Sequence, residues 1–194
     1  MRPRSSRLGH RLPGRTGASA GEDGAYRHPH GSLEMVARSA QSVEVEIARL
    51  ARGELAVVHA VTRACFDLPY TLDTLKEYRR RAREGFLVAR IGSEIAGFSI
   101  ATAPGFPWSL FSRVGEIVLI GVRPDHQRRG LGQRLLTASF DHLRECGMRQ
   151  VRLHVDVTNA RALALYKRNG MRVSHVVRRY YRNGQDAYRM VGRL

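Results

Sequence analysis

The sequence contains only two cysteines and no long hydrophobic run. Cys65 and Cys146 lie far apart, with no second cysteine pair and no histidines at the spacing of a zinc site, which predicts reduced thiols in the core. Without a run of about 18 apolar residues, no membrane-spanning helix is expected. These absences predict a cytoplasmic protein that needs no metal ion and does not associate with a membrane.

Acidic residues are also scarce, with 17 Asp and Glu against 33 Lys and Arg, for a formal net charge of +16. This excess predicts attraction to polyanions such as nucleic acid, ribosomes or phosphorylated cofactors. Four of the basic residues cluster in one predicted helix, at Arg79, Arg80, Arg81 and Arg83. They are interpreted either as a solvated helix face or as a contact with RNA or an acidic substrate.

Residues 1–42 are rich in Arg, Gly, Ser, Pro and His and have neither helical nor strand periodicity. A disordered basic tail is therefore expected. Two interpretations stay open: a tail that adds affinity for polyanions, or an upstream start codon with Met35 as the true first residue. The rest of the chain, residues 43–194, is long enough for one domain with a sizeable core.

Hydrophobic periodicity predicts the elements of this domain. Strands are expected at residues 43–47, 86–90, 95–101, 117–122, 150–157, 171–177 and 186–192, and helices at 55–66, 71–83, 131–146 and 159–169. An irregular loop around Pro104 and Pro107 is expected to carry Trp108 as a packing residue. Helices and strands alternate in the middle and hairpins lie at both ends, which predicts one mixed α/β sheet flanked by helices.

Residues 115–136, GEIVLIGVRPDHQRRGLGQRLL, read as a strand, a break at Pro124, a glycine-containing turn and a helix start. Such a turn directs backbone N–H groups and the positive end of a helix dipole to one point, which suits a phosphate or pyrophosphate. The turn lacks the GK[ST] of a Walker loop and the acidic residue of a dinucleotide site. Further along, Asn159 is expected to cap a helix that carries Tyr166 two turns later on the same face. Taken singly, Asn159 is better explained by capping alone, and Tyr166 by core packing.

The segments VRPDHQRRGLGQRLL at 122–136 and VTNARALALYKRNGM at 157–171 resemble the acetyl-CoA-binding motifs of the GCN5-related N-acetyltransferase (GNAT) superfamily. FDLPY at 66–70 and RRYYRNGQDAYRM at 178–190 resemble the subgroup that acetylates protein α-amino groups, which includes ribosomal-protein-alanine acetyltransferases. The resemblance covers about residues 43–194. It implies the GNAT fold, an α/β fold with a mixed, mostly antiparallel sheet of about seven strands, flanked by about four helices and splayed between its two central strands.

The resemblance also implies an activity and a set of site residues. The implied enzyme transfers an acetyl group from acetyl-CoA, as cosubstrate, directly to the N-terminal α-amino group of an acceptor protein or peptide. Tyr166 would be the general acid for the departing thiolate, and the backbone N–H near Val122 would stabilise the oxyanion. The residues implied for the cofactor are Ile120, Gly121 and Val122 for the pantetheine arm, Arg128, Arg129, Gly130, Leu131, Gly132 and Gln133 for the pyrophosphate, and Asn159.

The general base is where this sequence departs from the subgroup. A glutamate twelve residues before the catalytic tyrosine is replaced by His154, on the expected polar face of its strand together with Arg152 and Asp156. An imidazole can remove the proton of an α-ammonium, and Asp156 is expected to raise the pKa of His154. Glu116 matches the catalytic glutamate of the histone-acetylating branch, so His154, Glu116 and a water relay all stay open.

On the acceptor side, the resemblance places an apolar wall around the first residue of the peptide and two tyrosines on its backbone. These residues are Phe66, Leu68, Pro69 and Tyr70, and Tyr180 and Tyr181. An uncharged first side chain follows; alternatively, Phe66 and Leu68 only seal the core. The rival functions are acetylation of a lysine side chain or small amine, and non-catalytic binding of ribosomes or RNA. The sequence does not determine the oligomeric state, although a monomer is favoured.

Overall fold

The computed structural model describes residues 44–105 and 111–194, which belong to one compact unit formed by residues 40–194. The predictions for the N-terminal tail, for Val43 and for Phe106, Pro107 and Trp108 lie outside the described residues. Within the described part of the chain, no helix is long and apolar enough to cross a membrane.

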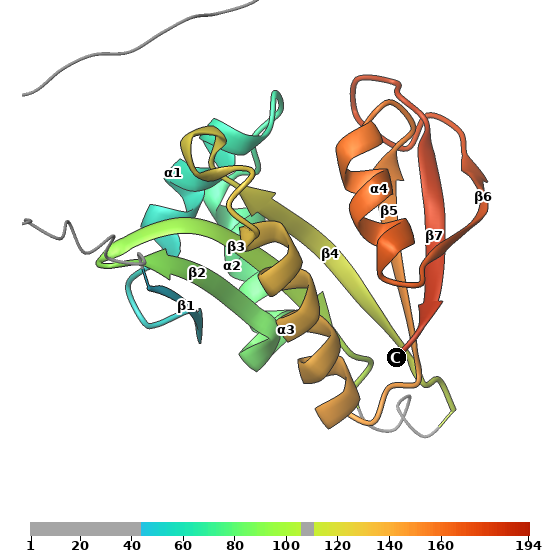
Figure 1. Ribbon diagram of the computed structural model, residues 1–194, viewed down its shortest axis with the longest axis horizontal. Helices are drawn as coiled ribbons and strands as arrows, with labels where there is room; N and C mark the ends of the chain where they lie inside the picture. Colours follow the sequence, from blue (N-terminus) through green and yellow to red (C-terminus); the bar gives the residue numbers. More distant parts are fainter. Residues whose placement is uncertain (1–43, 106–110) are drawn as a thin grey trace, which may run out of the picture. The chain divides into compact units, whose positions relative to one another are not determined.

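The described residues form seven strands, four α-helices and two short 3₁₀ helices (Figure 1). Their types and order confirm the sequence prediction, and the ends differ by at most three residues. The strands are β1 (Val45–Arg49), β2 (Phe86–Ile91), β3 (Glu94–Thr102), β4 (Val114–Val122), β5 (Gln150–Asp156), β6 (Arg172–Val177) and β7 (Ala187–Arg193). The helices are α1 (Leu55–Cys65), α2 (Leu72–Ala82), η1 (Arg83–Gly85), η3 (Pro124–His126), α3 (Leu131–Glu145) and α4 (Ala160–Arg168).

All seven strands belong to one sheet of order β1-β2-β3-β4-β5-β7-β6. Only β4 and β5 are parallel, and they pair only between Val114–Ile117 and Gln150–Leu153. Beyond Ile117 the two strands diverge, as Figure 1 shows. The mixed, mostly antiparallel sheet with a central splay is therefore confirmed.

Helices cover both faces of the sheet, and buried side chains of β4 pack against each of these two layers. Helix α3 buries residues at helical spacing against one face, and a hydrogen bond of 2.9 Å between Ser99 and Ser139 ties it to β3. Helices α1 and α2 pack on the other face (Figure 1). Between β3 and β4 the register shifts, so that Val118 has no partner in β3. This β-bulge lets Ile117 pack on the α3 side and Leu119 on the α1 side.

The two cysteines do not share one environment. Cys65 is half-buried at the end of α1, whereas Cys146 is exposed, and both are free thiols. The prediction of a core thiol is wrong for Cys146, because Leu143 is the last buried position of α3 and Cys146 is the exposed C-cap residue that follows the helix.

Gly85, the last residue of η1, lies so close to β3 that a Cβ atom on it would stand 2.2 Å from the carbonyl oxygen of Ala101. We expect Gly85→Ala to lower the free energy of unfolding by about 2 kcal/mol, because backbone must move to admit the methyl group. Gly105→Ala is the control, since a Cβ there would meet nothing within 4 Å. Urea unfolding of both variants measures the difference; equal stabilities would contradict this packing.

Candidate active site

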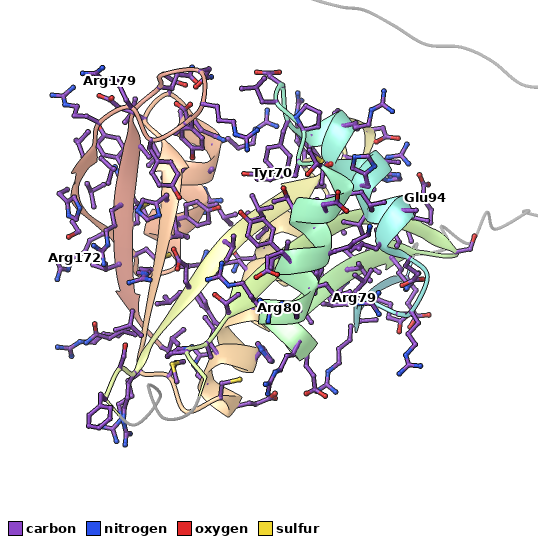
Figure 2. The ribbon with its side chains drawn as sticks, turned by 180° about the vertical axis from the view of Figure 1, so that it is seen from behind. Tyr70, Arg79, Arg80, Glu94, Arg172 and Arg179 are labelled. Atoms are coloured by element: carbon purple, nitrogen blue, oxygen red, sulfur yellow. The ribbon has the colours of Figure 1, made fainter. Side chains whose placement is uncertain are left out.

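The divergence of β4 and β5 opens a cavity of about 560 Å³. Its walls come from β4, β5, α4, the loop between α1 and α2, and the loop between β6 and β7. Figure 2 shows Tyr70 and Arg179 in these two loops, on opposite sides of the divergence. The predicted site residues that line the cavity are Phe66, Leu68, Tyr70, Ile120, His154, Asn159, Tyr166, Tyr180 and Tyr181.

The edge of β4 that faces β5 is unpaired beyond Ile117. Residues 118–122 lie in this stretch; β3 pairs with residues 119–122 along the other edge, and β5 has turned away. Backbone N–H and C=O groups on an open edge can bind an extended ligand as an added strand. The carbonyl of Val122 already accepts a hydrogen bond of 3.1 Å from Gln127 Nε2. Pairing of Ile120, Gly121 and Val122 with a pantetheine arm stays a prediction.

The turn before α3 has the geometry of an anion site. Gly130 at φ +78° is the N-cap of α3 and provides no side-chain cap, and Arg128 is also left-handed at φ +63°. A Cβ on Gly130 would meet nothing within 4 Å. The turn is open to solvent, and the first N–H groups of α3 have no capping side chain, so this cradle fits a pyrophosphate.

The residues predicted to line this cradle contribute in different ways. Arg128 and Arg129 are exposed and can add positive charge, whereas the side chain of Leu131 is buried in the core. Gln133 and Asn169 exchange hydrogen bonds of 2.7 and 2.8 Å between their side-chain amides. Leu131 and Gln133 therefore offer only backbone groups to a ligand.

Helix α4 contributes Tyr166 and its N-cap residue, Asn159, to the cavity lining. Tyr166 is only 5% exposed, and burial raises the pKa of its phenol well above the usual value, so it stays protonated. Oδ1 of Asn159 accepts a hydrogen bond of 3.0 Å from the backbone N–H of Ala162, which confirms the capping role. A role of Asn159 in holding the cofactor stays a prediction.

His154 lies on the polar face of β5, as predicted, with its ring stacked on Tyr180 at a centroid distance of 4.4 Å. Burial lowers its pKa below the usual 6.5, and nearby Glu116 partly offsets this. The expectation that Asp156 raises this pKa is wrong. Oδ1 of Asp156 instead accepts hydrogen bonds of 2.7 and 2.6 Å from the N–H and hydroxyl of Thr158.

Glu116 stands beside His154 but outside the cavity lining. Its Oε1 lies 3.9 Å from His154 Nδ1, and its Oε2 accepts a hydrogen bond of 3.1 Å from Arg152 Nη2. Sequence reasoning placed Arg152 on this face but missed the ion pair, since Glu116 and Arg152 meet only through the β4–β5 register.

The acceptor-side residues differ in their surroundings. Phe66 contacts both Tyr70 and the core residue Phe98, with ring centroids at 5.6 and 6.5 Å, so it lines the cavity and seals the core. Burial raises the pKa of Tyr70 to about 12. Leu68 is 55% exposed, so the alternative that it seals the core is wrong. Pro69 is exposed and does not line the cavity.

An aspartate that sequence reasoning missed organises the loop of Tyr180 and Tyr181. Asp186 accepts hydrogen bonds of 2.9 Å from the N–H of Arg179 and 2.7 Å from Nη1 of Arg178. The sequence feature that could have identified Asp186 is that it is the single acidic residue in a strongly basic segment.

The described residues also contain one group that could hold a metal ion, Glu94, Asp125 and His126. Arg123 forms ion pairs with the carboxylates of Glu94 and Asp125, so it already supplies a positive charge to this group.

Comparisons with known proteins agree with this architecture. The sequence model of the acetyltransferase (GNAT) family matches residues 55–171. An N-alpha-acetyltransferase of Sulfurisphaera tokodaii is 32% identical over 134 residues, which cover 64% of this chain and 76% of that protein. A mycothiol acetyltransferase of Thermobispora bispora is 33% identical over 103 residues, covering 50% of this chain and 35% of that longer protein.

Two solved structures share the fold. The ribosomal-protein-S18-alanine N-acetyltransferase from Escherichia coli has a TM-score of 0.67 and 25% identity, covering 77% of this chain and 94% of that one. Naa50 of Arabidopsis thaliana, solved with the bisubstrate analogue CoA-Ac-MVNAL, has a TM-score of 0.67 and 21% identity, covering 77% and 98%. From the family match, the related N-alpha-acetyltransferase and the splayed sheet, we conclude that the chain belongs to the GNAT family and is an N-acetyltransferase.

Proposed function

We propose that this enzyme transfers an acetyl group from acetyl-CoA to the N-terminal α-amino group of a protein, directly, in a ternary complex. One observation carries the proposal: His154 and Tyr166 line one cavity that is open between two loops with aromatic side chains. Such an opening suits an extended chain end that enters amine first. The related N-alpha-acetyltransferase supports the same substrate class.

The cosubstrate would lie along β4 and α3. The turn before α3 would hold the pyrophosphate through backbone N–H groups, with Arg128 and Arg129 adding charge. The open edge of β4 would pair with the extended arm. Acetyl-CoA supplies an acyl thioester that an amine can attack.

His154 is the best-placed general base. It lines the cavity and, since its pKa is lowered, it is neutral at pH 7 and can accept the proton of the α-ammonium. Glu116 is less suited, because it bonds Arg152 and lies outside the cavity lining. We assign Glu116 to stabilising the protonated imidazole at 3.9 Å. A water between His154 and the amine would serve the same transfer.

Tyr166 is assigned to the leaving sulfur. A thiol of pKa about 8.5 leaves as a thiolate, and a phenol that burial keeps protonated can donate a hydrogen bond and then a proton to it. Phe66, Leu68 and Tyr70 form the wall for the first acceptor side chain, which favours an uncharged residue such as Ala, Ser, Thr or Met. Tyr180 and Tyr181 would bond the peptide backbone.

A second candidate is a small-molecule amine acceptor, favoured by the similarity to a mycothiol acetyltransferase. The two candidates differ in the atom that is acetylated. Mass spectrometry of peptides after incubation with enzyme and acetyl-CoA should locate the new acetyl group on the α-amino nitrogen and identify the preferred first residue. Activity on lysine side chains or polyamines, with no peptide N terminus acetylated, would contradict the proposal.

A further inference from the structure

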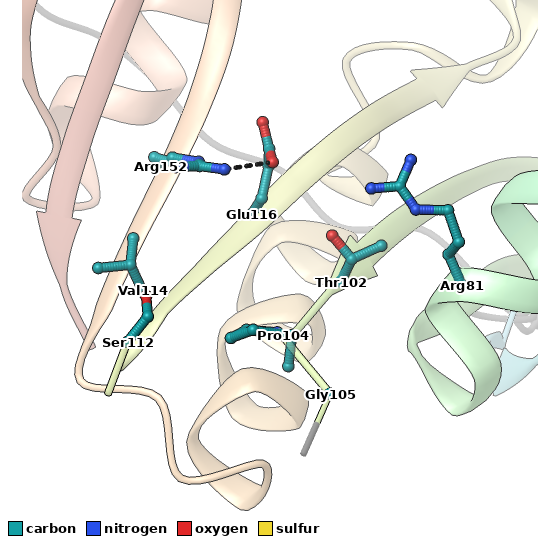
Figure 3. A pocket seen from close by; sticks show the side chains of 9 residues that line it. Arg81, Thr102, Pro104, Gly105, Ser112, Val114, Glu116 and Arg152 are labelled. Carbon is teal, nitrogen blue, oxygen red and sulfur yellow. Dashed lines mark hydrogen bonds and ion pairs between the residues drawn. The ribbon is translucent and has the colours of Figure 1, made fainter. Parts of the chain in front are cut away.

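A second cavity, of about 340 Å³, lies beside the reaction centre between α2, the end of β3, the start of β4, and β5 (Figure 3). Glu116 lines this second cavity and lies 3.9 Å from His154, which lines the first. The two cavities therefore adjoin at Glu116. Apart from Glu116, the residues that line the second cavity have no role in the proposed acetyl transfer.

The lining of the second cavity is positively charged. Arg81 from α2 and Arg152 from β5 stand on opposite sides of Glu116 and Thr102, as Figure 3 shows. Glu116 neutralises one guanidinium, which leaves one positive charge in excess. Within the described part of the chain, Arg81 makes no ion pair, and Nε of Arg152 is buried without a hydrogen-bond partner. The Arg152 side chain as a whole is 41% exposed and lines the cavity, so its outer N–H groups are open to an anionic ligand.

The distance between Arg152 and His154 matches the length of two residues of an extended peptide. Arg152 and His154 lie on one face of β5 two residues apart, which corresponds to about 7 Å. An extended acceptor covers the same distance in two residues. With its α-amino group at His154, the chain would bring the second or third side chain to Arg152, opposite Arg81. Val114 offers an apolar surface to methylene groups, and Thr102 and Ser112 offer hydroxyl donors.

We propose that the second cavity binds the carboxylate of an acidic residue at the second or third position of the acceptor protein. This inference rests on the proposed N-terminal acetylation. Guanidinium groups bind carboxylates with charge-assisted, often bidentate hydrogen bonds. Glu116 opposes an incoming anion, but its own bond to Arg152 and the charge of Arg81 outweigh that repulsion. In the arginine run of α2, Arg81 would therefore contact the substrate, whereas Arg80 pairs with Glu77.

The test measures kcat/KM for peptides that begin with Ala and differ at one position. Asp or Glu at the second or third position should raise kcat/KM about 10-fold over Asn or Gln, and the same acid at the sixth position should have no effect. The preference should shrink as salt is added. Arg81→Gln should remove it, and Arg81→Glu should favour Lys instead. Arg79→Gln is the control, since Arg79 lies on the same helix outside the cavity lining (Figure 2).

The possible outcomes separate this inference from the proposed function. Equal rates for acidic and amide peptides would overturn the acidic subsite and leave N-terminal acetylation standing. A preference that persists in Arg81→Gln would also overturn it, because the acid would then be recognised elsewhere. Acetylation of none of the peptides would overturn both.

Discussion

Replacing Tyr166 by phenylalanine is expected to lower kcat about 100-fold or more, while the Kd for acetyl-CoA changes less than about 3-fold. The variant keeps the ring that packs against the core and removes only the hydroxyl group. Loss of this donor leaves the departing thiolate without its proton, an interaction made mainly in the transition state. A kinetic assay of CoA release measures kcat, and isothermal titration calorimetry measures the Kd for acetyl-CoA.

Tyr188→Phe is the matched control, because Tyr188 packs against the same core but does not line the cavity. It should keep close to the wild-type kcat. A Tyr166→Phe enzyme that turns over at the wild-type rate would remove Tyr166 from the acid role. Because burial raises the pKa of Tyr166, its titration should not cause a loss of rate between pH 8 and pH 9.

Replacing His154 by glutamine is expected to lower kcat/KM at pH 7 about 100-fold and to abolish the rise in rate with pH. In the wild type, activity requires the neutral imidazole, so the rate should rise as His154 loses its proton. Since burial lowers this pKa, the midpoint should lie below pH 6.5. Profiles of kcat/KM from pH 5 to pH 9 measure the change.

The Glu116→Gln variant distinguishes the role of the Glu116 carboxylate from the role of the His154 imidazole. Glu116 raises the pKa of His154, so its neutralisation should move the midpoint to lower pH with a smaller loss of rate. If Glu116→Gln abolished the pH-dependent rise and His154→Gln kept it, Glu116 would be the base. His59→Gln, on α1 and outside the cavity lining, should leave the profile unchanged.

Much of the fold can be predicted from local sequence patterns. The alternation in β5, the apolar spacing of α3 and the Asn159 cap each depend on neighbours within a few residues, so periodicity and capping chemistry predict them. The glycine turn before α3 is local in the same sense. The positions of His154, Asn159 and Tyr166 followed from a resemblance to family motifs, and the structure places all three on one cavity.

Other features depend on partners that are distant in the sequence. The bulge at Val118 arises from the register with β3, and the pairing of Glu116 with Arg152 arises from the register with β5. The direction of the His154 pKa shift reflects its burial under Tyr180, which no spacing within β5 indicates. Local patterns could not predict these contacts, because packing and strand pairing set them.

By itself, the sequence determined the order of strands and helices, the glycine-containing turn before α3 and the family to which the chain belongs, since each rests on short-range chemistry. Only the tertiary structure decided that β4 and β5 separate after Ile117, that Glu116 stands between two cavities and that Arg81 faces Arg152. The physical reason is that these groups come from segments more than thirty residues apart, and the packing of α2 and the strand registers bring them together.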